Sequence, residues 1–183
     1  MKIIPTNLPD VHLLQPQVFS DDRGFFMETY HQRKLEALGI SAVFVQDNHS
    51  ASPQGILRGL HYQIRQTQGK LVRVIAGEVF DVAVDLRRHS PTFGHWTGLR
   101  LSADNQLMLW VPPGFAHGFY TLSPRAEFLY KVTDYYAPDC ERTLLWNDPQ
   151  LGIDWPLIDG QPPLLSPKDA LGRRLADAEI FDW

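Results

Sequence analysis

The chain has 183 residues, 44% hydrophobic and 21% charged, which is ordinary for one globular domain with a substantial core. Its formal net charge of −4 argues against non-specific nucleic-acid binding, although a local cluster of Arg and Lys could still meet an anionic small molecule. No stretch is apolar enough to span a membrane and the N-terminus lacks a secretory pattern, so we expect a cytoplasmic protein. The single cysteine, Cys140, excludes an intrachain disulfide and has no assigned role.

Short β-strands separated by turns rich in Gly, Pro, Asn and Asp are predicted along most of the chain. In chain order, a helix is expected at 32–38 with Gly39 as its stop, and a helical segment from Ser166, an N-cap residue followed by proline. No repeat or linker divides the sequence, so we expect a single domain over 1–183, an antiparallel β-sandwich or barrel. The strands expected between the two helices lie within 70–86, in two runs, and at 96–101, 106–111, 118–122 and 126–133.

The segment 70–86 carries the first sign of a functional cavity. Its second run, after a turn at Gly77, is apolar on one face, whereas the other face alternates small apolar residues with Asp81 and Asp85. A mixed face of this kind predicts a polar cavity inside a barrel. Long paired strands also leave edges, which such folds often cover by dimerising.

The stretch GILRGLHYQ, residues 55–63, places two glycines, an arginine and a histidine in an apolar strand pattern. His61 and His117 come from separate strands and could share a metal ion, but a stable site needs three or four ligands. No third ligand is spaced with them, and Gln63 stands where a second ligand would be wanted. We therefore expect no metal and interpret His61 as a base near neutral pH.

A carboxylate bound to the other ring nitrogen would orient such a base. Asp81, Asp85 and Asp169 are candidates among which spacing does not choose; otherwise the first two would be solvated strand residues and the third a helix cap. Inside a cavity, Lys70 could hold a developing oxyanion and Tyr130 could act as a general acid. Outside it, they would be a surface lysine and a packed aromatic.

Other residues are candidates for ligand binding. Arg58 lies inside an apolar strand, where an unpaired charge is costly, so an anionic ligand would satisfy it. Arg23 is most simply a turn residue beside a glycine, and residues 46–49 most simply form a polar turn. Tyr135 and Tyr136 offer flat faces that could stack on a nucleobase or pack at the surface. The residues alone thus predict an all-β domain with a cavity holding His, Lys, Tyr and Arg.

These residues fall in blocks that closely resemble the dTDP-4-dehydrorhamnose 3,5-epimerase family of cupin-fold isomerases. The resemblance implies a cupin-type jelly-roll β-barrel with a few short peripheral helices. It also implies epimerisation at C3 and C5 of dTDP-4-dehydro-6-deoxy-D-glucose, without metal or cofactor, in dTDP-L-rhamnose synthesis. The blocks run in order through nearly the whole chain: DDRGFFMETY (21–30), FVQDNHS (44–50), GILRGLHYQ (55–63), QGKLVRVIAGEVFDVAVDLRRHSPTFG (68–94), PPGFAHGF (112–119), AEFLYKVTDYYAP (126–138), WNDPQLGIDWP (146–156) and LSPKD (165–169).

The resemblance also implies roles for individual residues. His61 is similar to the base that removes the C3 and C5 protons, Asp169 to its carboxylate partner, and Tyr130 to the acid on the opposite face. Lys70 is similar to the lysine near the C4 oxygen, where enolate charge accumulates. Tyr136 is similar to the aromatic that stacks on thymine. The family's substrate-binding positions are matched by Arg23, Glu28, Gln46, Asp47, Asn48, Arg58, His117, Tyr136, Glu141 and Lys168.

The family's homodimer exchanges N-terminal strands, so Arg23 and Glu28 are expected in the neighbouring subunit's site. Neither nucleic acid nor a membrane is an expected partner. Three alternatives remain: an epimerase acting at C3 or C5 only, a 3,4-ketoisomerase of a related dTDP-sugar, and a non-catalytic cupin that binds nucleotide sugars. The intact set of His61, Lys70 and Tyr130 favours the double epimerase.

Overall fold

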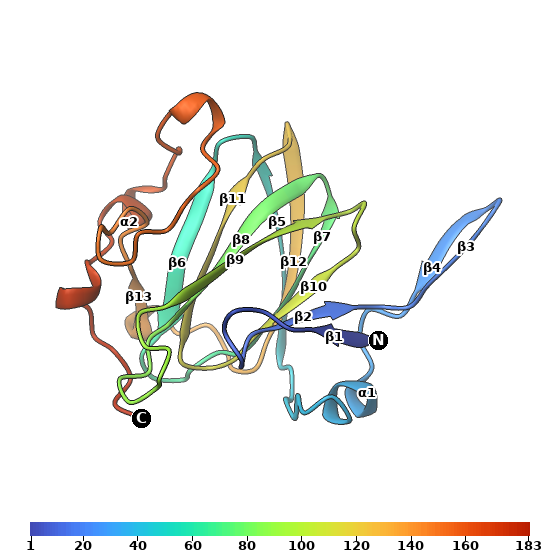
Figure 1. The fold of residues 1–183 in the computed structure, drawn as a ribbon, viewed down its shortest axis with the longest axis horizontal. Coiled ribbons are helices and arrows are strands. Elements are labelled where there is room, and N and C mark those ends of the chain that lie inside the picture. The colour runs from blue at the N-terminus through green and yellow to red at the C-terminus, as the bar shows by residue number, and fades with distance from the viewer.

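A computed structural model describes residues 1–183 as two facing antiparallel sheets (Figure 1). The larger sheet contains, in spatial order, β1 (Lys2–Ile4), β2 (His12–Gln15), β10 (Met108–Val111), β7 (Lys70–Ala76), β12 (Arg125–Val132) and β5 (Gln46–Pro53). The smaller sheet contains β13 (Glu141–Thr143), β6 (Leu57–Gln63), β11 (Phe115–Thr121), β8 (Glu78–Asp85) and β9 (Trp96–Ser102). The predicted all-β architecture is confirmed.

Helices are few and short. The first, α1 (Gln32–Glu36), is shorter than predicted, and Gly39 closes the turn after it with a φ of +86°. The second, α2 (Pro167–Ala170), begins as predicted, because the Ser166 hydroxyl accepts a hydrogen bond from the Asp169 N–H at 3.1 Å. No helix is long and apolar enough to cross a membrane. Three turns of 3₁₀ helix complete the set: η1 (Pro138–Cys140), η2 (Ile158–Gly160) and η3 (Leu175–Asp177).

The two strand runs predicted within 70–86 are β7 and β8, which lie in different sheets. The chain crosses between the sheets at Gly77, where an added Cβ would lie 2.1 Å from the Arg125 carbonyl oxygen. The mixed face of β8 points into the barrel, as predicted. Val79 on that face joins the core between the sheets, whereas Val82 on the apolar face joins a separate core.

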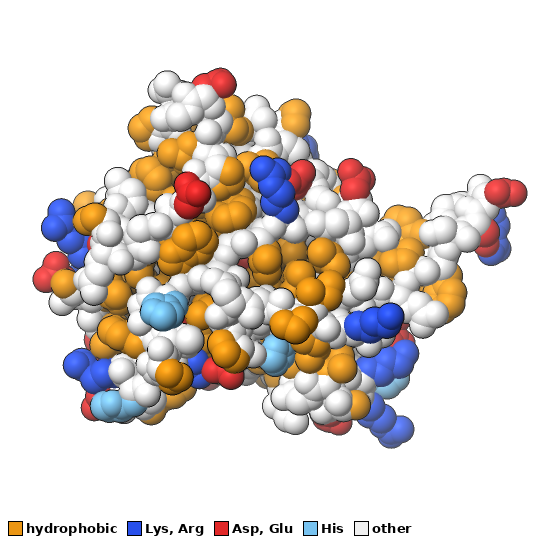
Figure 2. All heavy atoms as spheres, in the orientation of Figure 1, with side chains coloured by type: hydrophobic (Ala, Val, Ile, Leu, Met, Phe, Trp, Pro, Cys, Tyr) orange, Lys and Arg blue, Asp and Glu red, His pale blue; other side chains and the backbone are white.

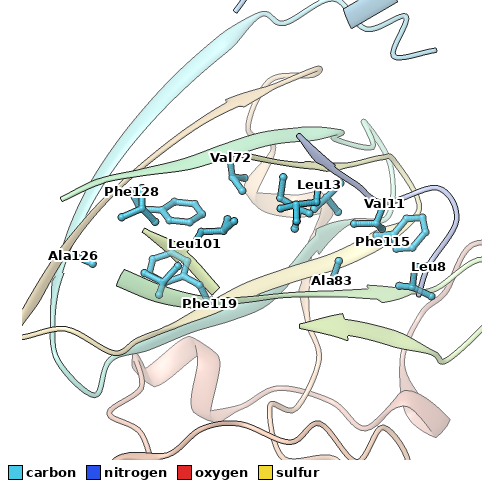
Figure 3. Close-up of a cluster of buried hydrophobic side chains, with 14 residues drawn as sticks. Leu8, Val11, Leu13, Val72, Ala83, Leu101, Phe115, Phe119, Ala126 and Phe128 are labelled. Atoms are coloured by element: carbon cyan, nitrogen blue, oxygen red, sulfur yellow. The ribbon is translucent and has the colours of Figure 1, made fainter. Parts of the chain in front are cut away.

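A hydrophobic core of 14 buried side chains lies between the two sheets (Figure 3). Phe119 of β11 stacks on Phe128 of β12 with ring centroids 4.3 Å apart, which joins the two sheets across the barrel. Both rings also line the polar cavity, so they form the boundary between the cavity and the hydrophobic core. A second core, which includes Trp155 and Phe181, packs the C-terminal segment onto the smaller sheet, and a third holds α1 through Leu35.

The strand β5 corrects the interpretation of residues 46–49 as a polar turn. The segment is extended, and its side chains alternate between partly buried and exposed positions. Gln46, Asn48 and Ser50 line the cavity, whereas Asp47 and His49 face solvent. Turn-forming residues are tolerated in this strand because one face borders a polar cavity and the other borders water.

A close contact between β6 and β11 explains why GILRGLHYQ and GFAHGF each have a glycine within the strand, at Gly59 and Gly118. Gly59 of β6 lies against Gly118 of β11 so closely that an added Cβ would be 2.5 Å from the Gly118 Cα. Gly59 also has a φ of +131°, in the region that favours glycine. The close approach borders the register pair His61–His117, at a register shift between β6 and β11.

A hairpin of β3 (Val18–Asp21) and β4 (Gly24–Met27) projects from the barrel as an arm (Figure 1). The side chains of Phe19, Phe25 and Phe26 on this arm are 56%, 60% and 69% exposed. Figure 2 shows hydrophobic side chains along the stem of the arm and charged ones at its tip. A group of exposed aromatic rings of this kind is typical of a surface that another molecule covers.

Candidate active site

A cavity of about 340 Å³ lies within the barrel and receives side chains from both sheets. Most of the predicted site residues line it, and the exceptions are Asp169, Asp47, Arg23 and Glu28. The lining consists of Gln46, Asn48, Ser50, Arg58, His61, Gln68, Lys70, His117, Gly118, Phe119, Phe128, Tyr130, Tyr136, Glu141 and Lys168.

His61 and Asp169 form a hydrogen-bonded pair beside this cavity, with 2.5 Å between Nε2 and Oδ1. Burial lowers the pKa of His61 although Asp169 opposes that change, so the imidazole is neutral near pH 7. Burial alone would raise the pKa of Asp169, but the hydrogen bond from His61 and the nearby charges outweigh it and leave the pKa lowered. The Nε2–H therefore donates to a carboxylate, and the lone pair on Nδ1 is the basic site.

The other two candidate carboxylates have different partners. Asp81 is fully buried and accepts from His117 Nε2, with distances of 2.9 and 3.1 Å to its two oxygens. Burial raises the pKa of Asp81, against the opposing charges of His117 and Lys70. Asp85 instead accepts hydrogen bonds from Arg87 and from two hydroxyl groups at the end of β8. Of the three aspartates, Asp169 is the partner of His61, and Asp81 supports a second histidine in the same cavity.

Lys70 opens β7 and turns into the cavity rather than outward, with only 8% of its surface exposed. Its ammonium donates to the His61 carbonyl oxygen at 3.2 Å. Burial lowers the pKa of Lys70 to about 8, although nearby carboxylates oppose the change. The lysine therefore remains largely protonated at pH 7 and presents a positive charge inside the barrel.

Tyr130 of β12 reaches the cavity from the larger sheet, whereas His61 reaches it from the smaller one. Burial raises the pKa of the Tyr130 phenol, and the charge of Glu141 acts in the same direction. The phenol is therefore protonated at neutral pH and can donate a proton. Two groups of opposite function, a neutral imidazole and a phenol, thus face one space from different sheets.

Cationic side chains gather at the mouth of the cavity in a protein that is acidic overall. The Arg58 guanidinium donates to the Ser52 hydroxyl at 2.9 Å and to the Ala51 carbonyl at 3.3 Å, and it forms no ion pair. Lys168, at the start of α2, is half-exposed and lines the same opening. This arrangement suits an anionic ligand such as a diphosphate.

Tyr136 and Lys168 are joined through Glu141. The Tyr136 hydroxyl donates to one oxygen of the Glu141 carboxylate at 2.8 Å, and Lys168 pairs with the other oxygen at 2.8 Å. Burial alone would raise the pKa of Glu141, but these two contacts lower it, so the carboxylate is ionised. The Tyr136 ring is half-exposed at the rim of the cavity, where a planar ligand group could reach it.

Three predicted site residues lie away from the cavity. Arg23, at the tip of the arm, bonds only to Asp21, and Glu28 bonds to Lys34. Asp47 points out of the barrel and bonds to Lys131 at 2.9 Å. Within a single chain these three do not join the site, and their roles in binding stay predictions.

Sequence reasoning missed several residues of the cavity wall. Ser50 was missed because residues 46–49 were interpreted as a turn. Gln46, Asn48 and Ser50 lie at every second position, and this strand alternation is the signal that could have revealed Ser50. Gln68 donates to the Asp134 carbonyl at 2.8 Å and has no local pattern that marks it. No group of three or more His, Cys, Asp or Glu side chains is arranged to hold a metal ion.

The fold and its cavity define a cupin-type enzyme suited to acid–base chemistry. A histidine–carboxylate pair, a buried lysine and a phenol meet inside the same barrel. The family model for dTDP-4-dehydrorhamnose 3,5-epimerase matches residues 5–177, and the chain belongs to that family. It is accordingly an isomerase with the epimerase activity of dTDP-L-rhamnose biosynthesis.

Individual relatives are similar to this chain over its full length. The chain is 63% identical to dTDP-4-dehydrorhamnose 3,5-epimerase of Pseudomonas aeruginosa, with 99% of each chain covered. It is 57% identical to the enzyme of the same name from Salmonella typhimurium, with 100% of each covered. A crystal structure of the 3,5-epimerase from Legionella pneumophila, in complex with dTDP-4-keto-L-rhamnose, superposes with a TM-score of 0.96 at 52% identity, covering 100% of this chain and 98% of that one. The predicted cupin fold is thereby confirmed.

Proposed function

We propose that His61 and Tyr130 move the protons in a double epimerisation of dTDP-4-dehydro-6-deoxy-D-glucose at C3 and C5. The observation that carries this assignment is the short His61–Asp169 pair in a cavity that Tyr130 enters from the opposite sheet. The C4 ketone of this substrate acidifies the hydrogens on both neighbouring carbons. One base and one acid can therefore act on the two carbons in turn.

At each carbon the steps balance as a proton exchange. The Nδ1 lone pair of His61 takes the proton, the C–H electrons move into the enolate, and negative charge develops on the C4 oxygen. Tyr130 then protonates the carbon from the other face, which inverts it. His61 is left protonated and Tyr130 ionised, and exchange with water returns both to their starting states. Asp169 stabilises the imidazolium that forms.

Lys70 is the residue we assign to the enolate. Its ammonium is buried in the same cavity and lies beside His61, with a hydrogen bond to the His61 carbonyl at 3.2 Å. A fixed positive charge in a site of low dielectric stabilises a developing oxyanion strongly. His117, whose ring is oriented by Asp81, lines the same cavity and is assigned to substrate binding.

The nucleotide end of the substrate is assigned to the cavity mouth. Arg58 and Lys168 supply the positive charge that a diphosphate requires, and Tyr136 offers a half-exposed ring for the thymine base. Gln46 and Asn48, hydrogen-bonded to each other at 2.9 Å, line the same cavity. The arrangement therefore has separate places for the reacting sugar and for the nucleotide.

We also propose that the chain works as a homodimer in which the arms are exchanged. The exposed phenylalanines of the arm need a covering surface, and β5 is an edge strand of the larger sheet with an open hydrogen-bonding side. An arm lying along the partner's β5 would bring Arg23 and Glu28 towards the partner's cavity. Gel filtration with light scattering tests the stoichiometry; Phe25→Asp together with Phe26→Asp should yield a monomer, and an unchanged dimer would contradict the arm exchange.

The catalytic assignment is tested by incubation with dTDP-4-dehydro-6-deoxy-D-glucose in D₂O, followed by NMR. We expect deuterium at both C3 and C5, with or without EDTA. Incorporation at only one carbon would overturn the double epimerisation. His61→Ala should abolish exchange at both positions, and retained exchange would show that another group is the base.

A further inference from the structure

Gln63, the last residue of β6, is buried with 4% exposure, and the assignments above leave it without a role. Its amide nitrogen donates to two carbonyl oxygens, those of Gln66 at 2.6 Å and Tyr135 at 3.2 Å. Its amide oxygen accepts from the Ala137 N–H at 2.8 Å. Both amide hydrogens and the amide oxygen are therefore bonded to backbone groups.

Two of these bonds bracket Tyr136, because Tyr135 and Ala137 are its chain neighbours. The ring of Tyr136 is half-exposed, so packing alone does not hold it at the rim of the cavity. Its backbone N–H donates to Gln46 at 3.1 Å and its hydroxyl donates to Glu141 at 2.8 Å. Gln63 adds hydrogen bonds to the backbone on both sides of Tyr136, at Tyr135 and Ala137.

The chemistry at this position requires an amide. A glutamate of the same length has no hydrogen to donate when ionised, so it would face the two carbonyl oxygens of Gln66 and Tyr135 without a bond. A methionine would fill the space but leave all three backbone groups unpaired. Because unpaired buried polar groups are costly, either substitution favours a different path for residues 135–137.

We propose that Gln63 is a positioning residue that orients Tyr136 for stacking on the nucleobase, and so sets the affinity for the nucleotide. This inference rests on the contact between Tyr136 and thymine in the function proposed above. An ordered aromatic platform spares the ligand the entropy cost of fixing the loop when it binds. Gln63 makes no hydrogen bond to the proton-transfer residues, so it should affect binding rather than chemistry.

The test is Gln63→Glu, measured by calorimetric titration with dTDP and by steady-state kinetics. We expect the Kd for dTDP and the KM to rise about tenfold each, with kcat changed by less than about twofold. The matched control is Gln54→Glu, in the turn between β5 and β6, which removes an exposed amide-to-carbonyl bond to Leu122 and should change neither constant. An equal loss in kcat, or an unchanged Kd, would overturn the proposal.

A double-mutant cycle separates positioning from general loosening of the fold. In a Tyr136→Ala background, Gln63→Glu should weaken dTDP binding no further, because the ring that Gln63 orients is gone. Additive effects would show that Gln63 does not act through Tyr136. If the glutamate variant is poorly folded by circular dichroism, Gln63→Met is measured in its place, with the same expectations.

Failure of the Gln63 proposal and failure of the proposed function give different results. Wild-type turnover tests the epimerisation, whereas the ratio of Kd values for dTDP tests Gln63. Normal turnover with unchanged nucleotide binding in the Gln63 variants would overturn only the inference. A wild-type protein that binds dTDP without exchanging protons would overturn only the catalytic assignment.

Discussion

Replacing Lys70 by methionine should make the protein more stable and catalytically inactive. The lysine is 8% exposed, and burial lowers its pKa from 10.5 to about 8. At 1.36 kcal/mol for each pH unit, keeping this ammonium buried costs roughly 3 kcal/mol of folding free energy. Methionine has a similar length and no charge, so it should recover much of that cost while removing the group assigned to the enolate oxygen.

The sign of the pH dependence follows from the two protonation states. Below pH 8 both the folded and the unfolded chain carry the proton on Lys70, so the full cost is present. Between about 8 and 10.5 the folded chain loses the proton first, so the wild type gains stability as the pH rises. If the ammonium is required for catalysis, kcat/KM falls over the same range, about tenfold for each pH unit above 8.

Urea denaturation at pH 7 and pH 9.5 measures this effect. The free energy of unfolding of Lys70→Met should exceed that of the wild type at pH 7, and the difference should shrink at pH 9.5. Lys2→Met is the matched control, because Lys2 is exposed and should show no such dependence. Parallel stability profiles for the wild type and Lys70→Met, or a variant less stable at pH 7, would refute the reasoning.

Four further predictions concern two carboxylates, the acid and a glycine contact. Asp169→Asn removes the charged partner of His61 and should lower kcat by about 10²-fold or more; a loss under tenfold, measured by product NMR, would contradict the pairing. Tyr130→Phe should still exchange substrate protons with D₂O but form little inverted product, and normal product yield would remove Tyr130 from the role of acid. Asp85→Ala strips the carboxylate from a buried hydrogen-bond network and should cost about 3 kcal/mol or more in urea unfolding, and a loss below about 1 kcal/mol would speak against it. Gly118→Ala would place a Cβ 2.6 Å from the Arg58 carbonyl oxygen and should lower both Tm and activity; a wild-type Tm would show that β6 and β11 can separate freely.

Local sequence patterns sufficed for much of the architecture. The alternation in β8 predicted which face enters the barrel, and the Ser-Pro pair predicted the start of α2. Gly39 marked the turn that follows α1, although the helix ends earlier than predicted, at Glu36. These features depend on neighbouring residues only, because strand alternation, helix capping and backbone permissiveness act within a few positions of the chain. The β5 strand was missed because its polar residues are also typical of turns, whereas in the fold one of its faces borders the cavity and the other borders water.

The site itself depended on long-range contacts. Spacing could not choose a partner for His61 among three aspartates, because Asp81 and Asp169 both lie on elements that could reach it. The packing of α2 against β6 decides the matter, since it brings together two side chains 108 positions apart in the chain. The contacts of Gln63 also depend on long-range packing. In the sequence this residue argued only against a metal site, whereas two of its three hydrogen bonds exist because β6 ends beside residues 135–137. The sequence by itself determined the types of residue available for proton transfer, and only tertiary packing decided which of them meet, because hydrogen bonds act over a few ångströms irrespective of separation along the chain.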